Sequence, residues 1–254
     1  MNLIQLLDLR TTVGTIALLI LSAMTLAYPP TRAKLLARRA RDWFIDLACI
    51  AVIPILIPLL QMGVTYALYL WIIPSFKQSL TIHPAFALLL NPLLVDYLWY
   101  WNHRLFHAPT PIWNIHATHH SAPQLDVLVS FRSSIWSPLF TPYIWVNALA
   151  VFSLKDPGYF LLGGILGGII NFWVHTSFGP KPGSSLYQVV SLALITPHDH
   201  SWHHNSSRNS CNFGTVFNFW DKWHGTWYSP QTTPLNLGLA FRDSAWKEFF
   251  FPFY

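Results

Sequence analysis

Long segments without a charged side chain constrain the fold of this sequence more than any other feature. Five segments lack Asp, Glu, Lys and Arg, with Asp96 as the single exception: residues 11–31, 47–76, 78–103, 133–154 and 157–180. A helix needs about 20 apolar residues to cross the hydrocarbon core of a bilayer. The pattern therefore predicts five transmembrane helices, at residues 11–28, 47–73, 84–102, 135–152 and 158–176.

The shortage of charge also excludes several classes of protein. Only 10% of the residues are charged, whereas soluble domains average about 25%. This argues against a soluble enzyme, a disordered chain and a nucleic-acid-binding protein. We expect an all-α integral membrane bundle of about four to five transmembrane helices with a cytoplasmic helical cap. One membrane domain covers residues 1–254, with N-terminal spans and a basic loop (1–80), a central region (81–235) and a tail (236–254).

Basic residues predict the orientation in the membrane. Residues 32–41, between the first two predicted spans, carry five Lys or Arg side chains, and cytoplasmic loops are enriched in these residues. Placing this loop in the cytoplasm puts 12 of the 15 basic residues there, all except Arg10, Lys77 and Lys155. The C-terminal FFFPFY has no lysine-based retrieval signal. We therefore expect a bacterial inner membrane, with the endoplasmic reticulum as the alternative.

Three smaller features complete the organisation of the chain. The apolar segment 186–195 is too short to span a bilayer, so we expect it to be interfacial or buried. The GGILGG sequence at 163–168 allows two helices to pack closely, which favours a contact within the chain over a homodimer. Cys49 and Cys211 lie far apart and do not form a disulfide framework.

Histidine is unusually frequent: its 12 copies outnumber the 10 Asp and Glu residues together. Nine of them fall in three clusters and one isolated position: HRLFH at 103–107, HATHH at 116–120, His175, and HSWHH at 200–204. The orientation derived from Lys and Arg places all nine on the cytoplasmic face. On a helix, the spacings HxxxH and HxxHH direct two or three imidazoles to one side.

Neutral imidazole binds iron, zinc, copper and nickel. One tetrahedral site needs about four ligands, so nine histidines predict two metal ions. The alternative for any single histidine is a hydrogen-bonded interfacial residue, which we favour for His83. His198 and His224 stay open as possible ligands. A metal-binding membrane protein or transporter is the main alternative function, although a transporter would place ionisable groups near the bilayer midplane.

The order and flanks of these clusters resemble the fatty acid hydroxylase/sterol desaturase superfamily. The resemblance covers residues 90–235 and includes DYLWYWNHRLFH, HATHH, TPHDHSWHHN and NFGTVFNFWDKWHGT. It implies a fatty acid hydroxylase-like catalytic region and a membrane oxygenase with two iron ions on the cytoplasmic face. It also implies hydroxylation or desaturation of a lipid (sterol, fatty acyl or related) with O2 and external electrons. The implied iron ligands are His103, His107, His116, His119, His120, His175, His200, His203 and His204.

The resemblance also sets the expected partners. The lipid would enter from the bilayer, and electrons would come from a separate donor of the cytochrome b5, ferredoxin or reductase type, because no such segment is evident in the sequence. The chain departs from the family pattern at His198-Asp199 and at His224. A hydrolase or isomerase that uses the same histidines without oxygen chemistry remains a further alternative.

Asp96 is the one carboxylate inside a predicted span. It precedes His103 by two helical turns, so both residues lie on one helix face. A carboxylate within a bilayer is costly unless it is paired. We expect Asp96 to orient a ligand imidazole or to pair with a nearby Arg, with a helix-packing hydrogen bond as the alternative. Trp99, Tyr100 and Trp101 are expected to anchor the chain at the interface and to pack.

Overall fold

A computed structural model describes residues 3–108, 111–239 and 244–252, with side chains from Thr11 onward. The described residues are helical, with turns and isolated bridges but no named strand. The helices are α1 (Leu3–Ala27), α2 (Pro29–Leu36), α3 (Ala40–Pro58), α4 (Tyr66–Ile72), α5 (Pro84–Phe106), α6 (Pro111–His120), α7 (Pro142–Ser153), α8 (Gly158–Val174), α9 (Ser185–Val190), α10 (Pro197–His203), α11 (Phe219–His224) and α12 (Ala245–Phe250). Three short 3₁₀ segments lie at Pro74–Phe76, Val127–Phe131 and Ser137–Phe140. The side chain of Arg10 and part of the predicted tail lie outside the described residues.

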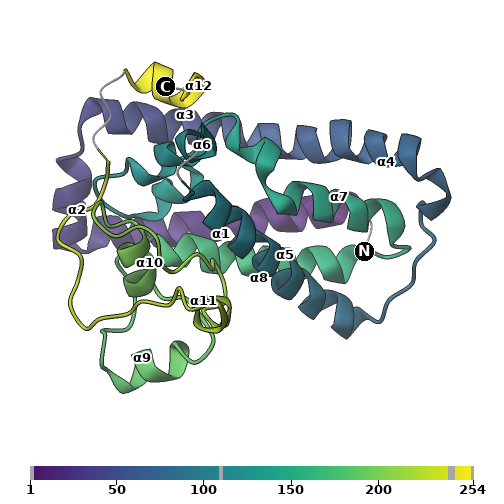
Figure 1. The fold of residues 1–254 in the computed structure, drawn as a ribbon. Helices are drawn as coiled ribbons and strands as arrows, with labels where there is room; N and C mark the ends of the chain where they lie inside the picture. The colour runs from purple at the N-terminus through teal and green to yellow at the C-terminus, as the bar shows by residue number, and fades with distance from the viewer. Residues whose placement is uncertain (1–2, 109–110, 240–243, 253–254) are drawn as a thin grey trace.

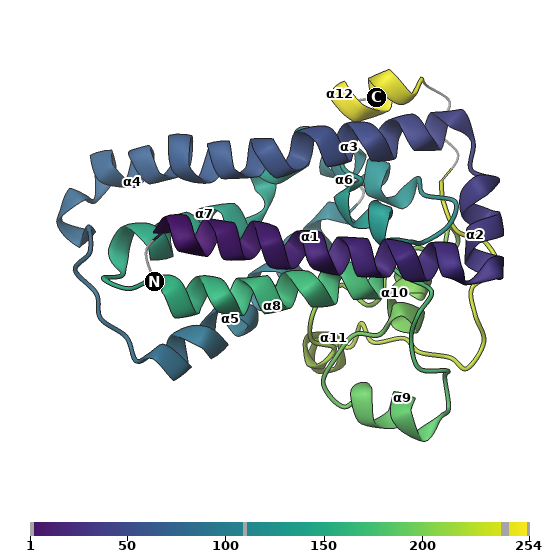
Figure 2. The same cartoon turned by 180° about the vertical axis from the view of Figure 1, so that it is seen from behind.

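The long helices form a bundle, and the histidine-bearing segments gather at one end of it. Helix α8 packs along both α1 and α5, and α7 packs against α4 and α5. Figure 1 shows α6, α10 and α11 at the same end as α2, while the α4–α5 connection lies at the opposite end. The reverse view in Figure 2 shows α1 and α8 side by side. This arrangement brings four separate parts of the chain to one end of the bundle.

Among the described residues, one helix is long and apolar enough to cross a membrane. Residues Ala40–Ile72 form a continuous helix that covers the predicted span 47–73 except for its last residue. Its π-helical part, Leu59–Thr65, directly follows Pro58. Proline has no N–H to donate to the preceding turn, which accounts for the local change in hydrogen bonding. This helix supports the membrane character expected from the sequence.

The other predicted spans are helical, but they are shorter, bent or less apolar; α5 has 23 residues and still does not reach the same mean hydropathy. Among the described residues, the only other segment of comparable length and hydropathy is the pair α1–α2, taken together, and it bends by 97° between Ala27 and Pro29. Helix α7 begins at Pro142 and not at residue 135, where the sequence analysis placed the fourth span. The residue before a proline prefers an extended conformation, and Thr141 adopts one. The number of spans therefore stays a prediction.

Glycines allow α5 and α8 to approach closely. A Cβ on Gly163 would lie 2.3 Å from the Leu88 carbonyl oxygen, and a Cβ on Gly164 would lie 3.1 Å from Asn91 Oδ1. The Asn91 side chain in turn donates a 2.9 Å hydrogen bond to Asn147 on α7. The first two glycines of GGILGG thus pack within the chain. A Cβ on Gly168 would meet nothing within 4 Å.

A buried network of charges joins distant parts of the chain. Arg132 donates to Asp46 at 2.6 Å and to Asp42 at 3.3 Å. Arg38 forms ion pairs with both Asp46 and Asp126. Buried charges are tolerated only when they are paired and hydrogen-bonded. The network therefore fixes the start of α3 against the segment 126–132 that follows the HATHH cluster.

The segment 186–195 is partly exposed. Leu186, Val189 and Leu192 are exposed, whereas Ile195 is fully buried. From the sequence alone, both an interfacial and a buried position are possible for this segment. The first part of the segment is not buried, because α9 is a short helix that only partly covers its own apolar residues.

Candidate metal centre

The structure brings the nine predicted histidines into two neighbouring groups. In each group, the candidate ligand atoms all lie within 4.8 Å of one another. The five-histidine group consists of His103, His107, His116, His120 and His203. The four-histidine group consists of His119, His175, His200 and His204. The rings of His120 and His204 stack 4.5 Å apart, so the two groups are adjacent.

Two short helices supply ligands to both groups. Helix α6 contributes His116 and His120 to the five-histidine group and His119 to the four-histidine group. Helix α10 contributes His203 to the five-histidine group and His200 to the four-histidine group, and His204 follows directly after it. The end of α5 adds His103 and His107 to the first group, and the end of α8 adds His175 to the second. Residues three or four apart on a helix lie on one side, so the three histidines of HATHH share one broad face. Which group each joins depends on the segments packed around α6: His119 lies beside His175, whereas His116 lies beside His103.

The distances between ring nitrogens match those expected of ligands on one metal ion. The Nε2 atoms of His103 and His116 lie 2.9 Å apart, and that of His175 lies 3.0 Å from His200 Nε2 and 3.3 Å from His119 Nε2. With metal–nitrogen bonds of about 2.1 Å, ligands at a right angle lie about 3.0 Å apart and ligands at a tetrahedral angle about 3.4 Å apart. Ligands on opposite sides of the ion would lie about 4.2 Å apart. Each group is therefore compact enough for a single ion.

Backbone carbonyls fix the orientation of four of these rings. The Nδ1 atoms of the histidines form hydrogen bonds of 2.7–3.1 Å with carbonyl oxygens: His103 with Phe213, His119 with Arg132, His175 with Asn171 and His203 with Cys211. A carbonyl oxygen only accepts, so Nδ1 carries the proton and Nε2 keeps a free lone pair. This arrangement, with one nitrogen held by the protein and the other turned inward, is typical of metal-binding histidines.

Several buried ring nitrogens have no hydrogen-bond partner among the described residues. They include both nitrogens of His107 and His120, Nε2 of His203, and Nδ1 of His200 and His204. A buried polar atom without a partner is costly. Burial, followed by the charges of neighbouring histidines, lowers the pKa of His120, His203 and His204 well below 6.5. The imidazoles are thus held neutral, as metal ligation requires, and the donor set fits a transition metal.

The carboxylate expected to orient an imidazole has a different contact. Asp96 accepts backbone N–H bonds from Thr215, Val216 and Phe217 at 2.9–3.0 Å, and a bond from the Trp220 ring at 3.1 Å. It contacts neither a ligand imidazole nor an Arg among the described residues. The prediction of a direct contact is therefore wrong for this structure. The bonds of Asp96 are explained by the loop that folds back onto α5.

A second carboxylate, which the sequence analysis did not single out as a site residue, holds the same loop. Asp221 accepts bonds from the backbone N–H groups of Phe213 and Gly214, both at 2.8 Å. The Phe213 carbonyl orients His103, so Asp221 acts on that ligand through the loop. A Cβ on Gly214 would lie 2.3 Å from the Phe217 carbonyl oxygen, which requires glycine there. The signal was present in the NFGT and WDKWHGT flanks.

The remaining histidines lie outside both groups. His198 Nε2 is 2.7 Å from the Pro230 carbonyl oxygen. His224 stacks on Tyr100 with ring centroids 5.0 Å apart. His83 precedes α5, and its Nδ1 accepts a 3.3 Å bond from Ala85 N–H. None of the three belongs to either candidate ligand group.

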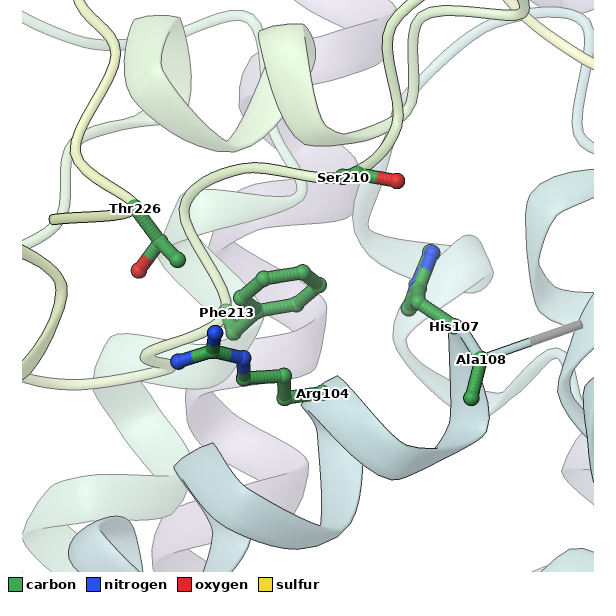
Figure 3. Close-up of a pocket in the computed structure, with 6 residues that line it drawn as sticks. All are labelled: Arg104, His107, Ala108, Ser210, Phe213 and Thr226. Atoms are coloured by element: carbon green, nitrogen blue, oxygen red, sulfur yellow. The ribbon is translucent and has the colours of Figure 1, made fainter. Parts of the chain in front are cut away.

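A cavity of about 230 Å³ opens onto the five-histidine group (Figure 3). It is lined by Arg104, His107, Ala108, Ser210, Phe213 and Thr226. His107 belongs to the five-histidine group, and the Phe213 ring packs against it with ring centroids 5.3 Å apart. Arg104 and Ser210 are exposed. The cavity therefore connects the five-histidine group with the surface of the protein.

Comparison with known proteins agrees with this site. The chain is 30% identical over 148 residues to alkylglycerol monooxygenase from Homo sapiens, a match that covers 58% of this chain and 31% of the relative. It is 28% identical over 160 residues to ornithine lipid hydroxylase OlsE from Rhizobium tropici (61% and 46%), and 26% identical over 191 residues to alkylglycerol monooxygenase from Xenopus tropicalis (74% and 41%). The matches thus span less than half the length of these relatives. No solved structure matches significantly.

A family model matches the histidine-rich region of the chain. The model for fatty acid hydroxylases covers residues 88–226, which is more than half of the chain. These residues include all nine histidines of the two groups, together with Asp96 and Asp221. The chain therefore belongs to the fatty acid hydroxylase family.

Proposed function

We propose that this protein is a membrane-bound di-iron oxygenase that hydroxylates a lipid, using O2 and electrons from a separate donor. The observation that carries the proposal is the pair of adjacent histidine groups, each compact enough for one ion, within the region that defines the family. Nine neutral imidazoles suit iron, and neither group includes a carboxylate.

The residues of the chain have definable roles in such an enzyme. Iron supplies the oxidising power that cleavage of an unactivated C–H bond requires and that side chains lack. The five-histidine and four-histidine groups would hold one ion each. The carbonyls of Phe213, Arg132, Asn171 and Cys211 keep four ligand rings in the binding tautomer. Seven of the nine candidate ligands are buried, which limits the access of water to the part of the centre away from the cavity at His107.

The names of the relatives support oxygen insertion into a lipid. Two are alkylglycerol monooxygenases and one is an ornithine lipid hydroxylase. Hydroxylation of a lipid is therefore proposed in preference to desaturation. Sterols, fatty acyl chains and other lipids all provide the unactivated C–H bonds on which such an enzyme acts.

The proposed arrangement in the membrane follows from the charges. Four to five helices cross the bilayer, and the histidine groups lie on the cytoplasmic side, in a bacterial inner membrane or the endoplasmic reticulum. The lipid enters from the bilayer, and a cytochrome b5, ferredoxin or reductase supplies electrons. A homodimer through GGILGG would use Gly168, because Gly163 and Gly164 pack against α5. Nucleic acid is not among the proposed partners.

The test combines metal analysis with lipid analysis. The purified protein should hold two iron ions per chain, and lipid extracts from cells that express it should contain a species with one additional oxygen atom. His120→Ala should lose iron and the oxidised lipid. The matched control is His83→Ala, which changes a histidine outside both groups. Purified protein with all nine histidines but no transition metal would contradict the proposal. A lipid that loses two hydrogens would instead assign desaturation.

A further inference from the structure

A series of aromatic rings leads away from the five-histidine group. The Phe213 ring lies 5.8 Å from His103, 5.3 Å from His107 and 5.8 Å from His203, measured between ring centroids. On its other side, Phe213 contacts Tyr100 at 6.1 Å. Tyr100 is fully buried. The phenol is thus one ring removed from three candidate metal ligands.

The series continues from Tyr100 to the surface. The Tyr100 ring stacks on His224 at 5.0 Å, and His224 stacks on Trp223 at 5.6 Å with the two rings 9° apart. Trp223 is 74% exposed. We use the term aromatic series for Phe213, Tyr100, His224 and Trp223. It connects the candidate metal centre with solvent through successive ring contacts.

The hydroxyl of Tyr100 has a built route for its proton. Thr226 Oγ1 lies 2.7 Å from Asp221 Oδ1 and 3.0 Å from the Tyr100 hydroxyl. An ionised carboxylate only accepts, so Thr226 donates to Asp221 and its oxygen accepts from Tyr100. Arg104 donates a 3.2 Å bond to the Tyr100 oxygen, which leaves the hydroxyl proton directed to Thr226. Both separations lie within the range for proton transfer.

The end of this route is suited to receive a proton. Asp221 is fully buried. Burial raises the pKa of Asp221 above its usual value. A neutral carboxylic acid is therefore tolerated at this position, although the backbone N–H groups of Phe213 and Gly214 favour the ionised form.

We propose that Tyr100 is a redox relay between the five-histidine group and the surface at Trp223; this inference rests on the proposed oxygenase function. Tyr100 gives one electron to a metal ion in its higher oxidation state. Its O–H proton passes to Thr226, whose own proton passes to Asp221, so one O–H bond breaks at Tyr100 and one forms at Asp221. A one-electron protein donor carrying haem, flavin or an iron–sulfur cluster returns the electron through Trp223, and the proton returns along the same hydroxyls.

The relay is tested by oxidising the protein from outside. The full chain, purified in detergent, is illuminated with ruthenium tris-bipyridine and chloropentaamminecobalt(III) as the electron acceptor, which leaves oxidised ruthenium tris-bipyridine as a bulky one-electron oxidant. This oxidant cannot contact the buried Tyr100 and must act through an exposed ring. We expect a tyrosyl radical in the electron paramagnetic resonance spectrum, with a narrower signal in protein that contains ring-deuterated tyrosine. Tyr100→Phe should remove this component, whereas Tyr97→Phe, one helical turn away, should retain it.

Two surface variants keep the test independent of folding. Trp101 is also exposed, at 43%, and its ring lies 5.5 Å from that of Tyr100, so both variants are made in a Trp101→Leu background. In that background, Trp223→Leu should lower the yield of the Tyr100 radical at least fivefold, and Trp246→Leu should leave it unchanged, although Trp246 is also exposed, at 57%. Thr226→Val should lower the yield while retaining Tyr100, because the phenol then has no proton acceptor. A residue with a structural role alone would not show these effects.

The outcomes separate the relay from the oxygenase. Photo-oxidation does not depend on bound iron, so absence of iron would contradict the proposed function and leave this measurement intact. Equal radical yields in Trp223→Leu and Trp246→Leu, or an unchanged spectrum in Tyr100→Phe, would overturn the relay. If Trp223 were instead buried in lipid or detergent, the charged oxidant could not reach it. Trp223→Leu and Trp246→Leu would then give equal radical yields.

Discussion

The two histidine groups differ in what surrounds them. The five-histidine group packs against Trp99, Phe106, Trp113 and Phe213 and opens onto a cavity. In the described part of the chain, the aromatic ring contacts of the four-histidine group are all with other histidines, and carbonyls of Arg132 and Asn171 hold two of its rings. The first group is thus connected to the surface, whereas the second is connected to the buried charge network and to α8. This difference suggests that the two sites will respond separately to mutation.

The largest effect is expected from removing one ligand in each group. His120→Ala should lose the metal of the five-histidine group and His204→Ala that of the four-histidine group, so each variant should retain one of two ions. Turnover should fall at least 100-fold in both, because removing even an outer residue that supports a metal ligand costs about 10–100-fold. Metal content per chain, measured by mass spectrometry, checks this. Loss of both ions from either variant would show that the groups form a single site.

The nine candidate ligands were apparent from the sequence, but their division into two groups was not. HxxxH and HxxHH spacings indicate which imidazoles share a helix face. Whether His119 joins His116 or His175 depends on how α6 sits against α8 and α10, which local spacing does not determine. Asp96 was singled out from the sequence, but its partners were out of reach, because it bonds to residues 119–121 positions away.

The buried charges illustrate the same limit. Arg38 and Arg132 were assigned to membrane orientation, since both count equally as basic residues in predicted cytoplasmic segments. In the structure they pair with Asp46, and Arg132 lies 86 positions away from it in sequence. Their burial depends on tertiary packing, whereas the positive-inside pattern counts residues without locating them.

Arg132 connects this network to the four-histidine group and gives the next largest effect. Arg132→Met removes the buried cation that Asp42 and Asp46 share, so that Asp42 pairs only with Arg39 and Asp46 only with Arg38, and removing one member of a buried ion pair costs about 3–5 kcal/mol. The free energy of unfolding in detergent should fall by that amount. Arg39→Ala is the matched control, because Arg39 is 67% exposed in its pair with Asp42, and exposed pairs contribute about 0–1 kcal/mol. Equal losses of unfolding free energy in Arg132→Met and Arg39→Ala would contradict a larger contribution of the buried network to stability.

Loosening the loop should affect only the five-histidine group. Asp96→Asn keeps the shape of the side chain but removes part of the acceptor set that holds residues 215–217. The loop also carries the Phe213 carbonyl that orients His103. We expect about 10–100-fold weaker metal binding at the five-histidine group, measured by competition with a chelator. An equal loss at the four-histidine group would contradict the proposed separation, and Asp156→Asn, at an exposed position, should change neither.

Both groups should share one dependence on pH. Burial lowers the pKa values of His120 and His204 well below 6.5, so below pH 6.5 the unfolded chain binds more protons than the folded chain. The stabilising contribution of these neutral imidazoles is therefore present above pH 6.5 and is lost as the pH falls. Each extra proton bound by the unfolded chain costs about 1.4 kcal/mol per pH unit. Thermal unfolding of metal-free protein between pH 8 and 5 measures this, and a stability that rises on acidification would refute it.

The smallest effect tests whether the cavity is the route by which the five-histidine group meets solvent. Ser210 lines the cavity at an exposed position and lies opposite Arg104 and Thr226 in Figure 3. A phenylalanine there would fill part of the 230 Å³, which His107 also lines, without replacing any candidate ligand. Ser210→Phe should therefore slow extraction of metal from the five-histidine group by a soluble chelator about two- to fivefold, equivalent to less than about 1 kcal/mol in activation free energy. Extraction from the four-histidine group provides the internal control, because no ligand of that group lines this cavity. If both ions leave more slowly in the variant, the cavity serves both sites, and the contrast between an open and an enclosed group does not hold.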